Sequence, residues 1–261
     1  MREPMIDEMW FSVSHVVPIR NETDMLAATG SFYQTGGQRF LVTNRHVVVG
    51  KSKDCFPDKL KFRVHVDRSD PSKNQELLIQ LYDENKQPRW LEHPSYGSNV
   101  DIVAVDLGDI LPSQSVIRFI TSEDLFPDNA VPRFCEDCAV LGYPLDFYDR
   151  IQNLPMLRNA MISTPYPVGF QGNPYFLIDA KLHKGSSGSP VFTKSQSGFR
   201  MRNGRAVHGA GMGDRFLGIV SMDVSPEYTD HKLDLHRAWF GHLVEQIASQ
   251  DRNILRHTND G

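Results

Sequence analysis

The sequence predicts an all-β protein, and three observations support this fold class. Short apolar segments recur along the chain, and turn residues separate them. Helical periodicity is convincing only near the C-terminus. A stretch rich in Pro, Ser and Asp at residues 109–133 divides the expected strands into two series. Many short strands with few helices favour a sandwich or barrel architecture.

The first series of strands begins near Met25. Its strands are expected at residues 26–33, 39–43, 60–66, 77–82 and 102–105. A hairpin signal at residues 35–38 joins the first two of them. Residues 1–24 are mixed and polar, and we expect them to form an arm packed on the domain.

The second series follows the connection. Its strands are expected at residues 139–144, 159–164, 175–179, 190–193 and 216–221. Beyond them, Leu235, Trp239, Leu243 and Ile247 recur at a spacing of four. This spacing predicts an amphipathic helix over about residues 233–249.

Composition narrows the classes of partner. A chain of 261 residues can bury a large core. Its net charge of -4 gives no reason to expect nucleic acid or an anionic membrane as partner. No apolar run approaches the roughly 20 residues that span a bilayer.

The cellular compartment is predicted from the cysteines and the N-terminus. Three cysteines, Cys55, Cys135 and Cys138, cannot all pair within the chain, and a low, odd count fits a reducing compartment. The first eight residues carry acids where a signal peptide carries bases and then an apolar block. We therefore expect a cytoplasmic protein.

The stretch at residues 184–190 is the strongest candidate for chemistry. Gly185 and Gly188 flank a serine pair and can take positive φ, and Pro190 directs the chain into the next strand. Such a loop can expose a serine hydroxyl and aim successive N–H groups at one point, as a serine nucleophile requires. Short glycine-serine runs are more often flexible turns, so the assignment depends on a histidine and an aspartate elsewhere.

Three segments together resemble one family. They are residues 41–47 with His46, residues 101–105 with Asp101, and residues 185–190 with Ser187, in the order His, Asp, Ser. With them the chain resembles the chymotrypsin-like (trypsin-like) serine peptidases, above all the short bacterial forms without disulfides related to the Deg proteases. The resemblance runs from about residue 26 to the terminal helix.

The resemblance implies two packed antiparallel β-barrels with the active site between them and a C-terminal α-helix. It implies a single peptidase domain over residues 1–261, whose parts are a first barrel at 25–108, an inter-barrel connection at 109–133, a second barrel at 134–230 and a helix at 231–250.

The resemblance also implies the role of each site residue. Ser187 would be the nucleophile, His46 its general base, and Asp101 the group that orients the histidine. The N–H groups of Gly185 and Ser187 would form the oxyanion hole. Each residue also has a structural interpretation. His46 could be a histidine bonded to a backbone carbonyl, and Asp101 could be a turn residue. Ser186 and Ser189 are rival serines for the nucleophile, and the loop pattern selects Ser187.

The substrate cleft is expected beside the strand at residues 216–222. Ser221, Met222 and Asp223 would offer main-chain hydrogen bonds to an extended peptide. Lys181, six residues before Ser187, occupies the position at the base of the specificity pocket in digestive members. Because no acid stands there, we predict against cleavage after Arg or Lys and expect a small or apolar residue instead. Lys181 and Asp223 could pair and narrow the pocket.

Other candidates are weaker. Cys135 and Cys138 have the spacing of half a zinc site, but no second ligand pair lies at a suitable distance, so we expect no metal and no cofactor. The basic segment at residues 194–205 is expected to be a solvated hairpin loop, with contact to a regulatory partner protein as the alternative. The function is expected to be serine endopeptidase activity on proteins or peptides. A catalytically silent domain that binds extended peptides, and an esterase, remain alternatives.

Overall fold

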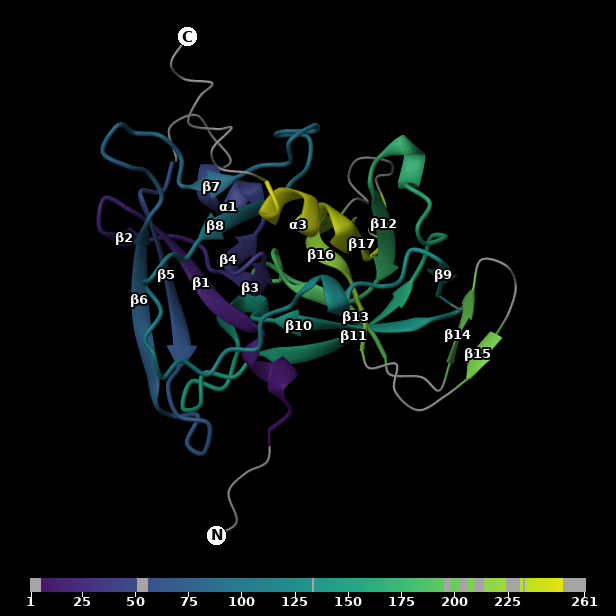
Figure 1. Ribbon diagram of the computed structural model, residues 1–261, viewed down its shortest axis with the longest axis horizontal. Helices are drawn as coiled ribbons and strands as arrows, with labels where there is room; N and C mark the ends of the chain where they lie inside the picture. The colour runs from purple at the N-terminus through teal and green to yellow at the C-terminus, as the bar shows by residue number, and fades with distance from the viewer. Residues whose placement is uncertain are drawn as a thin grey trace.

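The computed structural model describes residues 6–50, 56–132, 134–194, 198–201, 206–208, 214–223, 231 and 233–250. Its described part consists of a large N-terminal sheet, a closed C-terminal barrel and a helix, α3 (Gly241–Ala248), that contacts strands of both (Figure 1). The all-β class predicted from the sequence is confirmed.

The N-terminal sheet has eight strands, paired in the order β6-β5-β1-β3-β4-β8-β7 with β2 beside β1. They are β1 (Val13–Arg20), β2 (Thr23–Asp24), β3 (Ala28–Thr35), β4 (Gln38–Thr43), β5 (Lys59–His65), β6 (Asn74–Gln80), β7 (Trp90–Leu91) and β8 (Val103–Asp106). The two edges of the sheet come together just beyond β6 and just before β7, where Tyr82 and Pro88 form an isolated bridge. The sheet encloses one apolar core that includes Phe32, Phe62 and Leu81. The first barrel expected from the resemblance is thus a sheet whose edges meet at a single bridge.

The sequence interpretation of the N-terminus was wrong in part. Residues 13–20 are not an arm on the surface but the strand β1, which pairs with both β3 and β5. The first half therefore starts before residue 25. The strand was hard to recognise because Ser14 and His15 are buried together with Val13 and Val16. Burial on both faces removes the alternation that marks a half-buried strand.

The C-terminal barrel closes in the order β10-β11-β12-β17-β16-β13. Its strands are β10 (Asp137–Gly142), β11 (Met156–Ile162), β12 (Tyr175–Asp179), β13 (Pro190–Thr193), β16 (Phe216–Asp223) and β17 (Leu235–Phe240). Aromatic rings fill much of its core. Tyr166, Phe176 and Phe240 lie with ring centroids 5.1 to 5.5 Å apart.

The C-terminal helix in the structure is shorter than the sequence predicts. Residues 235–240 form β17, which pairs with β12 and β16 and closes the barrel, and only α3 is helical. The error has a physical reason. Residues four apart share a face in a strand as well as in a helix, so Leu235 and Trp239 fit both structures. Within α3, Leu243 and Ile247 are buried as the pattern indicated.

The connection between the halves is mostly irregular. Its two-residue strand β9 (Ala130–Val131) pairs with β14 (Gly198–Met201), which pairs with β15 (Ala206–His208). The short helical elements are α1 (Arg45–Val49) and the 3-10 turns η1 (Glu8–Phe11), η2 (Ser122–Asp124), η3 (Pro144–Asp146) and η4 (Phe170–Gly172). Within the described ranges, no helix has the length and apolar character needed to cross a membrane.

Candidate active site

His46 and Asp101 lie together at the end of the pairing between β4 and β8. Thr43, the last residue of β4, pairs with Val103 of β8, and this register brings the start of α1 next to Asp101. His46 Nδ1 lies 2.7 Å from Asp101 Oδ2, and the His46 backbone N–H donates to Oδ1 at 2.9 Å. Asn44 Nδ2 donates to the Asp101 carbonyl at 2.7 Å. The aspartate therefore fixes both the backbone and the ring of the histidine.

A further partner of Asp101 comes from the barrel. Ser221 of β16 is buried, and its Oγ donates to Asp101 Oδ2 at 2.6 Å. The sequence indicated only a main-chain role for Ser221, toward substrate. Its side-chain contact spans 120 positions of sequence, and no local pattern indicates it.

The surroundings of Asp101 keep its carboxylate charged. Burial alone would raise the pKa of this carboxyl group. The hydrogen bond and charge of His46, the Ser221 hydroxyl and the His46 backbone N–H act in the opposite direction and hold the pKa below its usual value. The site thus presents an ionised carboxylate to Nδ1 of the histidine.

Ser187 lies in the serine loop, which we define as residues 183–189. Strand β3 of the N-terminal half binds three carbonyls of this loop. The Thr29 N–H donates to the Ser187 carbonyl at 2.9 Å, and Thr29 Oγ1 donates to the Gly185 carbonyl at 2.9 Å. Ser31 Oγ donates to the Gly188 carbonyl, also at 2.9 Å.

Strand β16 holds the other side of the loop. The Gly188 N–H donates to the Val220 carbonyl at 3.0 Å, and the Val220 N–H donates to the Ser189 carbonyl at 2.9 Å. Because Ser221 follows Val220 and binds Asp101, the strand connects the loop with the histidine–aspartate pair. The structure therefore brings His46, Asp101 and the loop of Ser187 to one junction. Among the described residues no hydrogen bond joins the Ser187 hydroxyl to His46, and such catalytic contacts often tighten only with substrate bound.

Two N–H groups of the serine loop remain available. The Lys184 carbonyl accepts from the Leu145 N–H at 2.6 Å, and the Ser186 carbonyl accepts from the Ser189 N–H at 3.1 Å. In a planar trans peptide the N–H points away from the carbonyl, so both contacts fix the direction of the N–H that follows. These are the N–H groups of Gly185 and Ser187, and neither donates a hydrogen bond within the described part of the chain.

Both loop glycines are required by the backbone. Gly185 has a φ of 93°, and a Cβ there would lie 2.4 Å from the Tyr143 carbonyl oxygen. Gly188 has a φ of 86°, and a Cβ would lie 2.0 Å from the Thr29 carbonyl oxygen. The loop therefore accepts no side chain at either position.

The residues expected to line the specificity pocket are only partly described. Lys181 is exposed, and its carbonyl accepts from Arg158 Nη2 at 2.7 Å. The backbone of Met222 and Asp223 belongs to β16, but their side chains lie outside the described residues. The pairing of Lys181 with Asp223 therefore stays a prediction. In the basic segment, Lys194 Nζ lies 3.5 Å from Asp137 Oδ2 and part of the backbone forms β14, while the side chains after Lys194 lie outside the described residues.

The two described cysteines, Cys135 and Cys138, are not among the residues of this site. Cys138 is buried in β10, and burial raises the pKa of its thiol to about 12. Cys135 is exposed, and Cys55 lies outside the described residues. In the part of the chain that the structure describes, no three His, Cys, Asp or Glu side chains gather as a metal site would require.

Comparison with known proteins identifies the class. A family model for the trypsin-like peptidase domain matches residues 28–198, more than half of the chain. The protein therefore belongs to the trypsin-like peptidase family, a family of serine proteases. The search of curated protein sequences gave no match.

One solved serine protease shares the fold, and two further structures align with TM-scores below 0.5. A thermostable serine protease, AL20, from an extremophilic microorganism aligns with a TM-score of 0.53 and 13% identity over 93% of this chain and 97% of that one. The inactive form of Rv3671c from M. tuberculosis aligns with a TM-score of 0.47 and 17% identity over 92% and 88% of the two chains. The serine endoprotease from Yersinia pestis aligns with a TM-score of 0.49 and 11% identity over 95% of this chain and 64% of that one.

Proposed function

We propose that the protein is a serine endopeptidase whose nucleophile is Ser187. The observation that carries the proposal is the junction at which Asp101 holds His46 Nδ1 at 2.7 Å, beside a loop with two N–H groups that donate to no other described residue. Peptide-bond hydrolysis by serine requires a nucleophile, a base and donors for the developing oxyanion. The chain has a residue or backbone group for each of these tasks.

The chemistry follows from the fixed orientation of the histidine. With Nδ1 bound to the Asp101 carboxylate, the ring carries its proton there and leaves Nε2 free to accept one. His46 takes the proton of the Ser187 hydroxyl as the oxygen attacks the carbonyl carbon of the substrate. Asp101, kept ionised, stabilises the imidazolium that forms. The Gly185 and Ser187 N–H groups stabilise the oxyanion, where one donor contributes about 3 kcal/mol.

The second half of the reaction reverses these proton transfers. His46 gives its proton to the leaving amine, and the peptide bond breaks to leave an acyl group on Ser187. A water molecule then attacks this ester while His46 accepts its proton. Return of that proton to Ser187 Oγ releases the acid product and regenerates the enzyme.

The preference for substrate residues is a separate part of the proposal. An acid at the base of the pocket would select Arg or Lys, and the chain has Lys181 at the corresponding position. We propose that the residue before the cleaved bond is small or apolar, and that Ser221, Met222 and Asp223 of β16 bind the extended substrate through their backbone.

Digestion of a mixture of unstructured peptides, read by mass spectrometry, tests the proposal. The wild-type protein should cleave peptides, and Ser187→Ala and His46→Ala should each reduce the rate on the order of 10⁶-fold. Ser186→Ala is the matched control, because this neighbouring serine is buried in the same loop and should leave cleavage intact.

The alternatives predict different results. Hydrolysis of activated esters without any peptide cleavage would indicate an esterase. Peptide binding without hydrolysis of either substrate, by a folded protein, would indicate a silent binding domain. Cleavage mainly after Arg or Lys would contradict only the assigned preference.

A further inference from the structure

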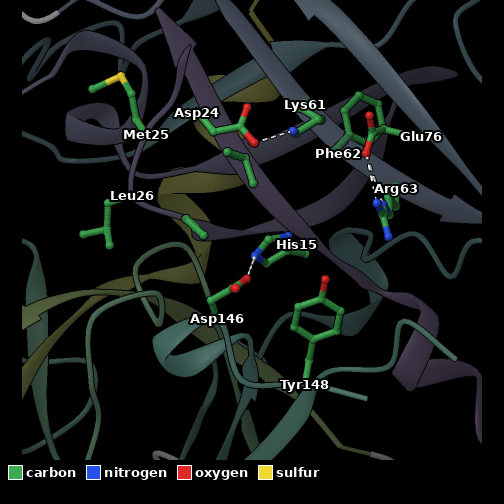
Figure 2. A pocket seen from close by; sticks show the side chains of 12 residues that line it. His15, Asp24, Met25, Leu26, Lys61, Phe62, Arg63, Glu76, Asp146 and Tyr148 are labelled. Atoms are coloured by element: carbon green, nitrogen blue, oxygen red, sulfur yellow. Dashed lines mark hydrogen bonds and ion pairs between the residues drawn. The ribbon is translucent and has the colours of Figure 1, made fainter. Parts of the chain in front are cut away.

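A pocket of about 400 Å³ lies between the N-terminal sheet and the segment that follows β10 (Figure 2). Charged pairs line it. Lys61 Nζ lies 2.6 Å from Asp24 Oδ2, and on the side nearer the barrel His15 Nε2 lies 2.8 Å from Asp146 Oδ1. Of these two pairs, only the one between His15 and Asp146 joins the two halves of the molecule.

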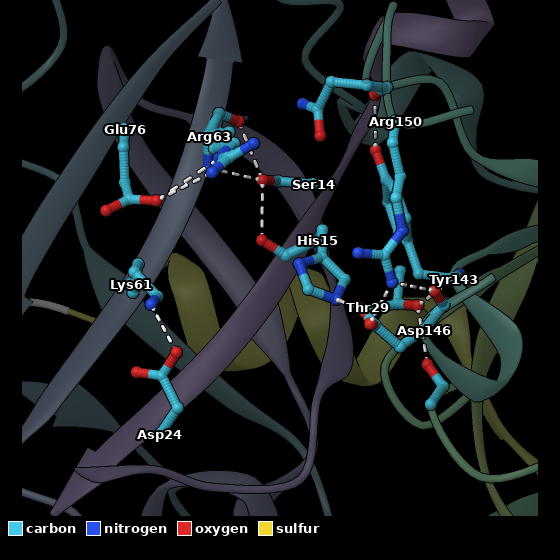
Figure 3. Close-up of polar contacts among 12 residues, drawn as sticks. Ser14, His15, Asp24, Thr29, Lys61, Arg63, Glu76, Tyr143, Asp146 and Arg150 are labelled. Atoms are coloured by element: carbon cyan, nitrogen blue, oxygen red, sulfur yellow. Dashed lines mark hydrogen bonds and ion pairs between the residues drawn. The ribbon is translucent and has the colours of Figure 1, made fainter. Parts of the chain in front are cut away.

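His15 is a buried residue of β1 with aromatic neighbours from the other half. Its ring stacks on Tyr148 at a centroid distance of 4.9 Å and meets the edge of Tyr143 at 5.3 Å. Figure 3 shows the ring beside Tyr143 and Asp146. Both tyrosines and Asp146 belong to one stretch of chain after β10, so His15 contacts two rings and a carboxylate of the same segment.

The turn that carries Asp146 has an unusual backbone. In η3 (Pro144–Asp146), Leu145 has a φ of 55° and Asp146 a φ of 56°. Residues with a Cβ rarely adopt this left-handed conformation, and surrounding contacts must hold it. The side chain of Asp146 supplies two such contacts, one with His15 and one with Arg150 Nη2 at 2.7 Å.

The same turn contacts the serine loop. The Leu145 N–H donates to the Lys184 carbonyl at 2.6 Å. This carbonyl belongs to the peptide group whose N–H is that of Gly185, so its direction sets the direction of the Gly185 N–H. A rotation of that peptide would break the Leu145 contact and turn one oxyanion donor away.

We propose that His15 is a positioning residue for the oxyanion hole. Its contact with Asp146 holds the left-handed turn, the turn holds the Lys184 carbonyl through Leu145, and the Gly185 N–H is thereby kept in the direction that catalysis needs. This inference rests on the proposed peptidase function and adds a residue of β1 to the site.

The charge state of His15 is set by all the groups that face it. Burial lowers the pKa of its imidazole, Asp146 acts in the opposite direction, and the positive charges of Arg63 and Arg150 lower it further. The net pKa lies below the usual value of the imidazole.

Amide hydrogen exchange of the Leu145 N–H is the direct test, because it does not depend on activity. His15→Phe keeps a ring between the tyrosines and removes the nitrogen. Asp146→Asn removes the charge, and Asn tolerates a left-handed φ as Asp does. Both variants should speed exchange at Leu145 about tenfold. Lys61→Gln is the control, since it removes another charged pair of the pocket, the one with Asp24, without touching the turn, and should leave exchange unchanged.

Kinetics with a peptide substrate give the second readout. Both variants should lower kcat about tenfold and leave KM within about twofold, because a misdirected oxyanion donor acts on the transition state alone. The double variant should lose no more than Asp146→Asn alone, since that substitution already breaks the contact with His15.

The outcomes separate the two proposals. Wild-type exchange at Leu145 in a folded His15→Phe protein would overturn the positioning role, whatever the kinetics. If His15→Phe does not fold, Asp146→Asn decides in the same way. A wild-type protein with no hydrolytic activity would overturn the proposed function, and the exchange measurement would still decide whether His15 holds the turn.

Discussion

The two halves of the molecule meet the serine loop with different chemistry. The N-terminal sheet presents buried hydroxyl groups, and Thr29 and Ser31 use them to bind loop carbonyls directly. The C-terminal barrel presents an aromatic core and a strand, β16, that binds the loop through its backbone. The hydroxyl groups of the sheet thus bind the Gly185 and Gly188 carbonyls, and β16 binds the end of the loop at Gly188 and Ser189.

This difference indicates where each kind of change should act. Apolar packing is not directional and tolerates small shifts. A hydrogen bond to one carbonyl is directional and is lost on rotation of a single peptide. Substitutions at the polar contacts between the halves should therefore change the reactivity of the loop more sharply than substitutions of similar size in the barrel core.

The largest expected effect is at Asp101, where both halves contribute. Asp101→Asn keeps the shape of the side chain but removes the charge that sets the histidine tautomer, and should lower kcat about 10⁴-fold. Ser221→Ala removes one hydrogen bond to the same carboxylate and should cost about tenfold. Steady-state kinetics on one peptide measures both. Equal losses in the two variants would contradict this order of importance.

The next largest effect is a loss of stability at Gly188, where the two halves approach each other closely. Gly188→Ala would place a Cβ 2.0 Å from the Thr29 carbonyl at a positive φ, and should lower the free energy of unfolding by about 3 kcal/mol. Gly36 is the matched control. It has a φ of 54° but no atom within 4 Å of a Cβ, so Gly36→Ala should cost about 1 kcal/mol. Urea denaturation gives both values, and similar losses would mean that strain rather than contact matters.

A smaller effect on the free energy of unfolding is expected at Thr29, whose hydroxyl group joins three segments of the chain. Thr29 Oγ1 donates to the Gly185 carbonyl and accepts from the Tyr143 N–H at 3.0 Å. Thr29→Val leaves both groups unpaired in a buried place and should lower the free energy of unfolding by about 2 kcal/mol. It should also reduce the rate of Ser187 acylation, since Gly185 loses a contact.

A nearby buried hydroxyl provides the control for Thr29. Ser189 Oγ has no hydrogen-bond partner among the described residues. Ser189→Ala should therefore leave the free energy of unfolding unchanged or raise it slightly. If Ser189→Ala lowered the free energy of unfolding as much as Thr29→Val, burial and not hydrogen bonding would determine the effect of both substitutions.

The smallest expected effect is a pH dependence of stability from the N-terminal half. Burial lowers the pKa of His65, although its hydrogen bond to the Gln152 carbonyl acts in the opposite direction. As the pH falls below about 6.5, the unfolded chain binds a proton at this residue before the folded protein does. Stability from this residue is therefore present above that pH and is lost as the pH falls.

The measurement is the free energy of unfolding in urea at several pH values between about 7.5 and 5. His65→Gln should reduce the slope with pH by at most about 1.4 kcal/mol per pH unit. Some slope should remain, because burial also lowers the pKa of His15 and His242. An unchanged slope in the variant would exclude His65 as a source of acid sensitivity.

Much of the fold could be predicted from the sequence because its strands are short, apolar and separated by turn residues. Two segments could not. In β1 the burial of Ser14 and His15 hides the alternation, and in β17 a spacing of four satisfies strand and helix alike. In both cases the partner strands decide the structure, and they lie far away in the sequence.

For the candidate site, the sequence indicated the three residues proposed for catalysis but not the contacts that hold them. The family resemblance named His46, Asp101 and Ser187, and the structure places the first two in contact and the third in the adjoining loop. The contacts of Thr29 with the loop and of Ser221 with Asp101 could not be predicted. They join residues more than 100 positions apart, and neither belongs to a local motif.

The central claim is that Ser187 is a nucleophile assembled with its base and its oxyanion donors. Labelling with a fluorophosphonate probe, located by mass spectrometry, tests it most directly, because the probe reacts only where all three are in place. We predict labelling at Ser187 in the wild-type protein and its loss in His46→Ala. A folded wild-type protein that remains unlabelled, or is labelled at another serine, would contradict the account.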